Sequence, residues 1–310
     1  MTLGMAGIVL IALLLIYAFG GKSAGLVSQS VVSGLLLGGV YALVAMGLTL
    51  IFGVLGIVNF AQGAMLTMSM YVVYYLVTTA GINLYVAAVI AIPVMFLFGW
   101  LVQSVLMNRL AEDTGHERPL MVTLGLSLLI VNVLLMFFGG RPLNSGSPLD
   151  GSVNIQFALV DIPRLVAFGG ALLVAAALAI IINKTPLGLA IRAVASNGTG
   201  AALVGVNVRR IYSMTFALGA ASVGVAGGLM VPFTSLVPSV GDQYTTLAFV
   251  IVVLGGLGSI RGALLGGLLI GLMQTVGSLF LPGSGALLMV FIAFVLILFL
   301  RPQGLFGANQ

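Results

Sequence analysis

The sequence predicts an all-α, polytopic bundle of transmembrane helices that forms one domain over residues 1–310, with membrane lipid as its solvent. Hydrophobic residues make up 61% of the chain and charged residues only 5%, so a water-soluble fold could not cover the apolar surface. Apolar runs long enough to span a bilayer fill nearly the whole sequence. The 43 glycines are too many for soluble helices, but in lipid they let helix backbones approach closely.

Breaks that contain charged residues, Gly or Pro divide the chain into about 8 to 10 helical segments, including broken or half helices. No Lys or Arg precedes the first segment, which favours a retained span over a cleaved signal peptide. The pieces that begin near Asn59 and Thr245 are candidates for half-helices. The expected segments lie at roughly 3–20, 30–52, 57–79, 83–107, 120–138, 165–183, 211–231, 244–256, 263–281 and 285–300.

The distribution of Lys and Arg predicts the orientation. With a cytoplasmic N-terminus, most basic residues fall inside, namely Arg109, Arg118, Lys184, Arg192, Arg209, Arg210, Arg261 and Arg301. Those that fall outside are Lys22, Arg141 and Arg164. We therefore expect a multi-pass protein of the bacterial inner membrane with both termini cytoplasmic. The loop at about 140–164 is then periplasmic, with a Val/Ile/Phe alternation typical of a strand, and the region at about 184–210 is cytoplasmic.

The ionisable residues argue against several chemical functions. The acidic residues and the single histidine lie in predicted loops or at segment ends, so no intramembrane group suits a proton relay; they are Glu112, Asp113, His116, Glu117, Asp150, Asp161 and Asp242. Gly21-Lys22-Ser23 ends like a phosphate-binding loop, but Ile16 occupies the required first glycine position. With no cysteine and scattered cations, we expect no catalytic, cofactor-binding or metal residue, no enzyme activity and no nucleic-acid partner.

Two Gly-rich breaks, one in each half of the chain, suggest an inverted repeat with broken helices. In the first, Gly53–Gly63, Asn59 and Gln62 are three residues apart and are expected on one helical face. They either bond neighbouring helices or line the solute path. In the second, Gly258, Gly262 and Gly266 recur every four residues and form a packing stripe, while the preceding glycines suit an unwound backbone; these are Gly255, Gly256 and Gly258.

The stretch Thr185–Arg210 is rich in small residues. Asn197 or Thr199 is placed to cap a short helix that runs to about Val204. An exposed, short amphipathic helix of this kind suggests docking into the groove of a partner protein. The alternative is an ordinary linker.

Taken together, these stretches resemble the H-type of the two paired permease subunits of branched-chain amino acid ABC importers, from about Gly34 to Gly304. Three motifs carry the resemblance, in the family's order and spacing. They are GGVYALVAMGLTLIFGVLGIVNFAQGAM, the G-x-A-x-R-A pattern at 188–193 followed by AALVGVNVRR, and VVLGGLGSIRGALLGG from Val252.

The resemblance implies a permease that moves amino acids, or related small solutes such as urea, amides or aromatic acids, by alternating access. The partners would be a second permease, two cytoplasmic ATPases that bind ATP and Mg, and a periplasmic solute-binding protein. The ATPase-coupling residues would be Arg192, Asn197, Ala201, Ala202 and Gly205. Those near the translocation path would be Asn59, Gln62, Gly63, Gly255, Gly256, Gly258 and Ser259. A self-sufficient sodium-coupled carrier is the alternative.

Overall fold

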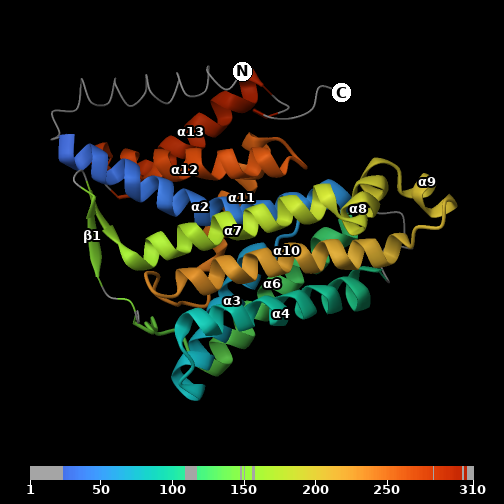
Figure 1. Cartoon of the computed structure of the whole chain (residues 1–310), viewed down its shortest axis with the longest axis horizontal. Helices are drawn as coiled ribbons and strands as arrows, with labels where there is room; N and C mark the ends of the chain where they lie inside the picture. Colours follow the sequence, from blue (N-terminus) through green and yellow to red (C-terminus); the bar gives the residue numbers. More distant parts are fainter. Residues whose placement is uncertain are drawn as a thin grey trace.

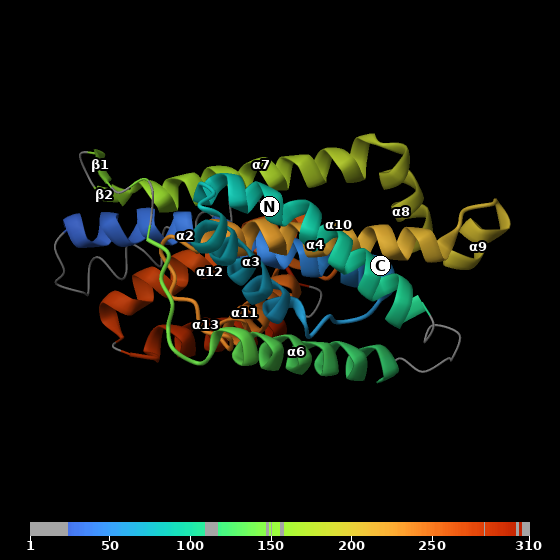
Figure 2. The same ribbon diagram turned by 90° about the horizontal axis from the view of Figure 1, so that it is seen from below.

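The chain forms an elongated bundle of helices that run mostly along its long axis (Figures 1 and 2). A computed structural model describes residues 24–108, 117–146, 149, 151–155, 158–281, 283–301 and 304–305. The expected segment 3–20 therefore lies outside the described residues, as do Glu112, Asp113, His116 and Asp150.

Each of the other nine expected segments corresponds to a helix. The elements are α2 (Ala24–Leu55), α3 (Gln62–Ala80), α4 (Leu84–Leu101), the π-helix η1 (Val102–Met107), α6 (Glu117–Phe138), β1 (Ser152–Ile155), β2 (Ala158–Asp161), α7 (Ile162–Lys184), α8 (Pro186–Ser196), α9 (Gly198–Leu203), α10 (Val208–Met230), α11 (Gly241–Gly255), α12 (Ile260–Phe280) and α13 (Gly285–Leu300). Within the described residues, seven helices are long and apolar enough to cross a membrane. The all-α polytopic fold class is confirmed.

The two expected half-helices have different outcomes. Helix α3 has 19 residues and is long enough to span, so the half-helix expectation is wrong there. Helix α11 has 15 residues and is too short for a straight span, as expected. Helix α3 continues through Met65–Met70, and every residue of this stretch except Met68 is buried inside the bundle.

Polar side chains cap the N-termini of four helices in the second half of the chain. The side chains of Thr185, Asn197, Asn207 and Ser259 each accept a hydrogen bond from a backbone N–H in the first turn of α8, α9, α10 and α12. These caps satisfy backbone donors that the helix itself leaves unpaired. The expected short helix after Asn197 is confirmed, and it ends at Leu203.

Strands β1 and β2 form a two-stranded antiparallel hairpin before α7, which confirms the strand expected in the 140–164 loop. Gln29 near the start of α2 fixes the hairpin: its Nε2 donates to the Leu159 carbonyl at 2.6 Å, and its Oε1 accepts from the Leu159 N–H at 2.7 Å. We call this end of the bundle the hairpin end. The opposite end, which carries α8 and α9, is the α9 end (Figure 1).

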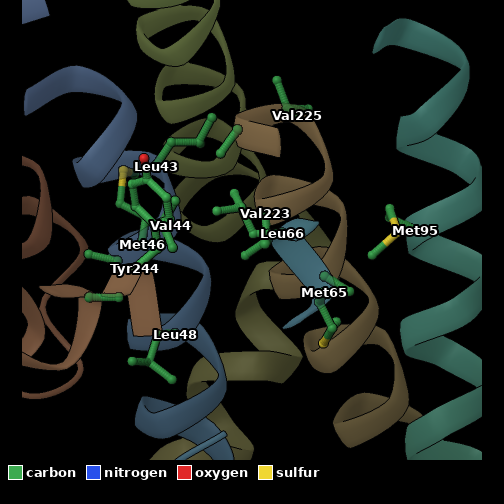
Figure 3. Close-up of a cluster of buried hydrophobic side chains, with 14 of the residues drawn as sticks. Leu43, Val44, Met46, Leu48, Met65, Leu66, Met95, Val223, Val225 and Tyr244 are labelled. Atoms are coloured by element: carbon green, nitrogen blue, oxygen red, sulfur yellow. The ribbon is translucent and has the colours of Figure 1, made fainter. Parts of the chain in front are cut away.

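The same helix contacts occur twice in opposite orientation, as an inverted repeat predicts. Helix α2 packs antiparallel against α12, and α10 packs antiparallel against α4. Helix α3 contacts α4 and α10, while α11 contacts α12 and α2. Thus α2, α3 and α4 correspond to α10, α11 and α12. The core lies where these helices meet, and Figure 3 shows side chains from several of them, including Leu43, Leu66, Met95, Val223 and Tyr244.

Glycines allow the closest approaches in this repeat. A Cβ at Gly63 would overlap the carbonyl oxygen of Gly241, and one at Gly241 would overlap that of Gly63, so the first turns of α3 and α11 meet backbone to backbone. A Cβ at Gly47 would lie 2.7 Å from the Gly219 carbonyl, and one at Gly219 would lie 2.9 Å from that of Gly47. Each of these two contacts joins corresponding positions of the two halves.

The two Gly-rich breaks are not the corresponding parts of the repeat. The break before α3, residues 56–61, corresponds to residues 231–240 before α11, because α3 and α11 are the paired helices. The second break, residues 256–259, lies against the first: a Cβ at Gly53 would lie 3.0 Å from the Cα of Gly258. The sequence pattern indicated two real breaks but paired them incorrectly, since Gly content alone does not distinguish symmetry from contact.

Basic residues gather at one end of the bundle. The residues at the α9 end are Arg118, Lys184, Arg192, Arg209, Arg210, Arg261 and Arg301, while Arg141 and Arg164 lie at the hairpin end. Lys22 and Arg109 lie outside the described residues. This is the segregation that the expected topology requires.

Candidate functional site

A cavity of about 430 Å³ opens toward the hairpin end. Helices α2, α7, α11 and α12 and the segment 231–240 supply its walls. The lining residues are Ser33, Leu36, Leu37, Tyr41, Arg164, Phe233, Thr234, Ser235, Gln243, Tyr244, Gln274 and Thr275. We call it the Arg164 cavity, because Arg164 is the only charged residue among them.

Arg164 enters the cavity from the first turn of α7. Its Nε lies 3.4 Å from Oδ2 of Asp161, the residue that precedes the helix, and both side chains are partly exposed. Its guanidinium carbon lies 6.0 Å from the centre of the Phe233 ring. Because the ion pair is formed through Nε, the two terminal nitrogens of the guanidinium can serve another partner.

Polar groups on the opposite walls come from membrane helices. The rings of Tyr41 on α2 and Tyr244 on α11 are 5.9 Å apart, and both residues are buried. Oε1 of Gln274 on α12 is buried and has no hydrogen-bond partner among the described residues. An acceptor without a donor is costly in an apolar environment. The cavity therefore offers an unused cationic fork, an unused acceptor and the apolar side chains of Leu36 and Leu37.

The predicted path residues Asn59 and Gln62 lie elsewhere. Neither is exposed at all, and neither lines the Arg164 cavity. Nδ2 of Asn59 donates to Oε1 of Gln62 at 3.1 Å, and Nε2 of Gln62 donates to the Val44 carbonyl on α2 at 3.0 Å. Asn59 precedes α3 instead of sharing a helical face with Gln62, because the backbone is irregular from Gly56 to Asn59. In this arrangement the two amides link α2 to α3.

Gly63 and the turn from Gly255 to Ser259 also lie outside the cavity lining. The turn is unwound as expected, with φ of 99° at Gly256 and 82° at Gly258, a backbone region that glycine favours. Ser259 caps α12, and Gly258 precedes that helix, so it does not belong to the packing stripe. Gly262 and Gly266 do pack closely, against α11.

The predicted coupling residues form the α8–α9 corner. A guanidinium nitrogen of Arg192 donates to the Ile182 carbonyl, which joins α8 to the end of α7. Asn197, Ala202 and Gly205 are exposed, whereas Ala201 is buried. The sequence pattern did not indicate the side chains that protrude farthest, Leu203 at 85% and Val204 at 80% exposure. The sequence did offer a signal for this exposed tip, because Leu203 and Val204 are adjacent apolar residues in a region expected to be cytoplasmic.

A second polar group, the η1 cluster, lies toward the α9 end and consists of Gln103, Ser104, Asn108 and Ser213. Ser104 Oγ donates to Ser213 Oγ at 3.1 Å, and Asn108 Nδ2 approaches the same oxygen at 3.1 Å. Gln103 Nε2 donates to Asn108 Oδ1 at 3.1 Å. These bonds close η1 against α10. π-Helical segments of this kind often occur at functional positions.

The sequence pattern did not identify the cavity. Arg164 was used only to predict the orientation from the distribution of Lys and Arg. Tyr41, Gln243 and Gln274 were not identified as candidate site residues. Gln274 offered a signal, since it is an amide inside an apolar run. Among the residues that the structure describes, no cluster of three or more His, Asp or Glu is placed to hold a metal ion.

Comparison with known proteins gives a consistent family. The family described as "Branched-chain amino acid transport system / permease component" matches residues 30–300. The chain is 31% identical over 296 residues to the high-affinity branched-chain amino acid transport system permease protein LivH of Salmonella typhimurium, covering 91% of this chain and 96% of that protein. It is 29% identical over 298 residues to BraD of Pseudomonas aeruginosa, with the same coverage.

A more distant relative is the ribose import permease protein RbsC of Haemophilus influenzae. It is 25% identical over 247 residues, which is 76% of this chain and 73% of that protein. No solved structure matches significantly.

Proposed function

Because the chain belongs to the family of branched-chain amino acid transport permeases, we propose that it is the membrane permease subunit of an ATP-driven importer of amino acids. It pairs with a second, related permease and with two cytoplasmic ATPases. A periplasmic solute-binding protein delivers the cargo. ATP and Mg bind to the ATPases, and this chain contributes no catalytic residue of its own.

The observation that carries this proposal is the α8–α9 corner. Leu203 and Val204 are largely exposed at the tip of a short capped helix. This tip lies at the end where Lys and Arg gather, which the positive-inside rule places in the cytoplasm. An apolar tip on a rigid helix suits a groove on a soluble partner. In this arrangement the partner meets the chain at the end opposite the Arg164 cavity.

Transport then follows alternating access. Closure of the ATPase dimer pushes on α9, and α8 passes the movement to α7 through the bond between Arg192 and the Ile182 carbonyl. Helix α7 carries Arg164 at its other end. The inverted repeat supplies two related halves that rock against each other around a central site. Both termini lie in the cytoplasm, and the hairpin end faces the periplasm of the inner membrane.

A pull-down of the tagged full-length chain from native membranes in mild detergent tests the proposal. We expect an ATPase, a second permease and a solute-binding protein to co-purify. The variant Val204→Asp places a charge on the α9 tip and should lose the ATPase. Val153→Asp on β1, a matched change at an exposed valine of the hairpin end, should retain it.

The opposite result would support the alternative of a sodium-coupled carrier. If the chain purifies without an ATPase and accumulates solute in liposomes under a sodium gradient, it is a self-sufficient carrier. The importer proposal would then be wrong.

A further inference from the structure

We propose that the Arg164 cavity is a binding site for the cargo, and that it recognises a zwitterionic α-amino acid with an apolar side chain. Arg164 would pair with the carboxylate, Gln274 would accept from the ammonium group, and Leu36, Leu37 and Phe233 would surround the side chain. This inference rests on the proposed function and adds to it the place in the fold where the cargo binds and the residues that would hold it. It is independent of the route by which the cargo reaches the cavity.

The charge in the cavity favours a carboxylate. Arg164 is the only charged lining residue, and the acids that lie close in sequence to lining residues, Asp161 near Arg164 and Asp242 next to Gln243, do not line the cavity. Asp161 is bound at the Nε edge, 3.4 Å away. The remaining two nitrogens of the guanidinium form the planar fork that binds a carboxylate through two hydrogen bonds.

The first turn of α11 adds to this preference. Gln243 and Tyr244, the third and fourth residues of α11, both line the cavity. The unpaired N–H groups at a helix start favour negative charge nearby. The N–H groups at the start of α11 therefore act in the same direction as Arg164 on an anionic group, and the exposed carboxylate of Asp242 in the same turn acts against them.

Gln274 provides the complementary acceptor. Its Oε1 is buried and makes no hydrogen bond among the described residues, while the Gln274 side chain, which lines the same cavity, also interacts with that of Tyr41. An ammonium group carries three donors and would satisfy it. A neutral solute such as urea could also donate to this oxygen, but it would leave the Arg164 fork without an anionic partner. The pair of unused groups thus matches an amino acid better than an uncharged amide.

The apolar part of the lining accounts for the side chain. Leu36 and Leu37 lie on α2, and Phe233 lies on the segment before α11, with its ring beside Arg164. The volume of about 430 Å³ falls within the range of roughly 300–1,000 Å³ that small-molecule sites occupy. An aliphatic side chain would bury its surface against these residues.

The absence of cysteine from the chain permits a direct test in native membranes. We would introduce Ser235→Cys in the cavity wall, with Ser152→Cys on exposed β1 as the matched control. A membrane-impermeant maleimide applied to spheroplasts should label both cysteines. L-Leucine should slow labelling at position 235 by roughly threefold or more, because a bound ligand covers most of the pocket wall, and should leave position 152 unaffected.

Two analogues separate the two polar contacts. Leucinamide lacks the carboxylate and 4-methylvalerate lacks the ammonium group, so each should protect Ser235→Cys less well than L-leucine does. Adding Arg164→Gln should raise the L-leucine concentration needed for protection by roughly 10- to 100-fold, the usual cost of a charged hydrogen bond. Arg141→Gln, an exposed arginine at the same end outside the lining, should not change it.

Three results would overturn the inference: no labelling at position 235, no protection by L-leucine, or equal protection after Arg164→Gln and Arg141→Gln. ATPase co-purification and leucine uptake by the same strains are measured in parallel. If both persist without protection, the cavity assignment alone is wrong. If the unsubstituted chain shows neither, the importer proposal is wrong, and protection by L-leucine would still identify the cavity as an amino acid site.

Discussion

Tyr41 on α2 and Ser213 on α10 occupy corresponding positions, since each lies six residues before the glycine through which the two helices touch, Gly47 and Gly219. At the hairpin end, Tyr41 lines an open cavity between α2, α11 and α12. At the α9 end, Ser213 is buried and accepts hydrogen bonds that hold η1 against α10. One scaffold is thus open at one end and closed at the other.

The two halves share their helix packing but not their polar side chains. The glycine contacts are shared by both halves, whereas the polar side chains differ between the two ends. The large side chain of Tyr41 separates the helices at the hairpin end, and the small hydroxyl of Ser213 lets η1 pack against α10 at the α9 end. Symmetric packing with unlike side chains at the two ends fits the alternating access that we propose.

The largest effect is expected where the two halves touch. Gly63→Leu would drive a side chain into the backbone of Gly241, which cannot move aside. We expect destabilisation at the upper end of the roughly 1–3 kcal/mol usual for overpacking, or beyond it, with loss of the monodisperse protein in detergent. Gly169→Leu on α7, where a Cβ would meet open space, is the matched control. Equal melting temperatures for the two variants would show that no such contact exists.

A smaller effect is expected at the closed end. Asn108→Ala removes the bonds to Gln103 and Ser213 and should weaken closure of the η1 cluster by about 1–2 kcal/mol. In inside-out vesicles, a cysteine in place of Ser104 should then react faster with a maleimide. Asn132→Ala, which removes only a bond within α6, serves as control. Unchanged reactivity after Asn108→Ala would mean that the cluster does not hold this end shut.

The smallest effect is expected at the β1–β2 hairpin and at the N-terminal cap of α9, which lie at opposite ends of the bundle. Gln29→Ala removes both bonds that fix the hairpin, and Asn197→Ala removes the cap of α9, each at a cost of about 1 kcal/mol. Hydrogen exchange should quicken only in 152–161 for the first variant and only in 198–203 for the second. Asn197→Asp keeps an acceptor at the cap and should behave like the natural chain. Faster exchange at both ends from either change would show that the edges are coupled.

The helices could be predicted because their signals are local. Apolar runs of spanning length predicted nine described segments, and Asn197 predicted the start of α9, because a cap acts on its own next turn. The unwound turn at 256–259 was also visible as a cluster of glycines. Each of these signals lies within a few residues of the structure that it specifies.

The cavity could not be predicted in the same way. Tyr41, Arg164 and Gln274 come from three helices more than a hundred residues apart, and only the packing of α2 against α7 and α12 brings them together. Likewise, Asn59 and Gln62 were correctly recognised as costly buried amides, but the sequence did not reveal that Gln62 donates to the Val44 carbonyl on α2. Pairing across the bundle is a property of the tertiary structure.

The glycine contacts at Gly47 with Gly219 and at Gly63 with Gly241 have a mechanical consequence. Where backbone touches backbone, no rotamer must be reset when one half tilts against the other, so only flanking side chains such as Ser222 and Thr245 would have to adjust. These contacts would therefore serve as a pivot near the centre of the molecule, about which one half can rotate against the other. If the two halves approach each other at the α9 end, they would then separate at the hairpin end.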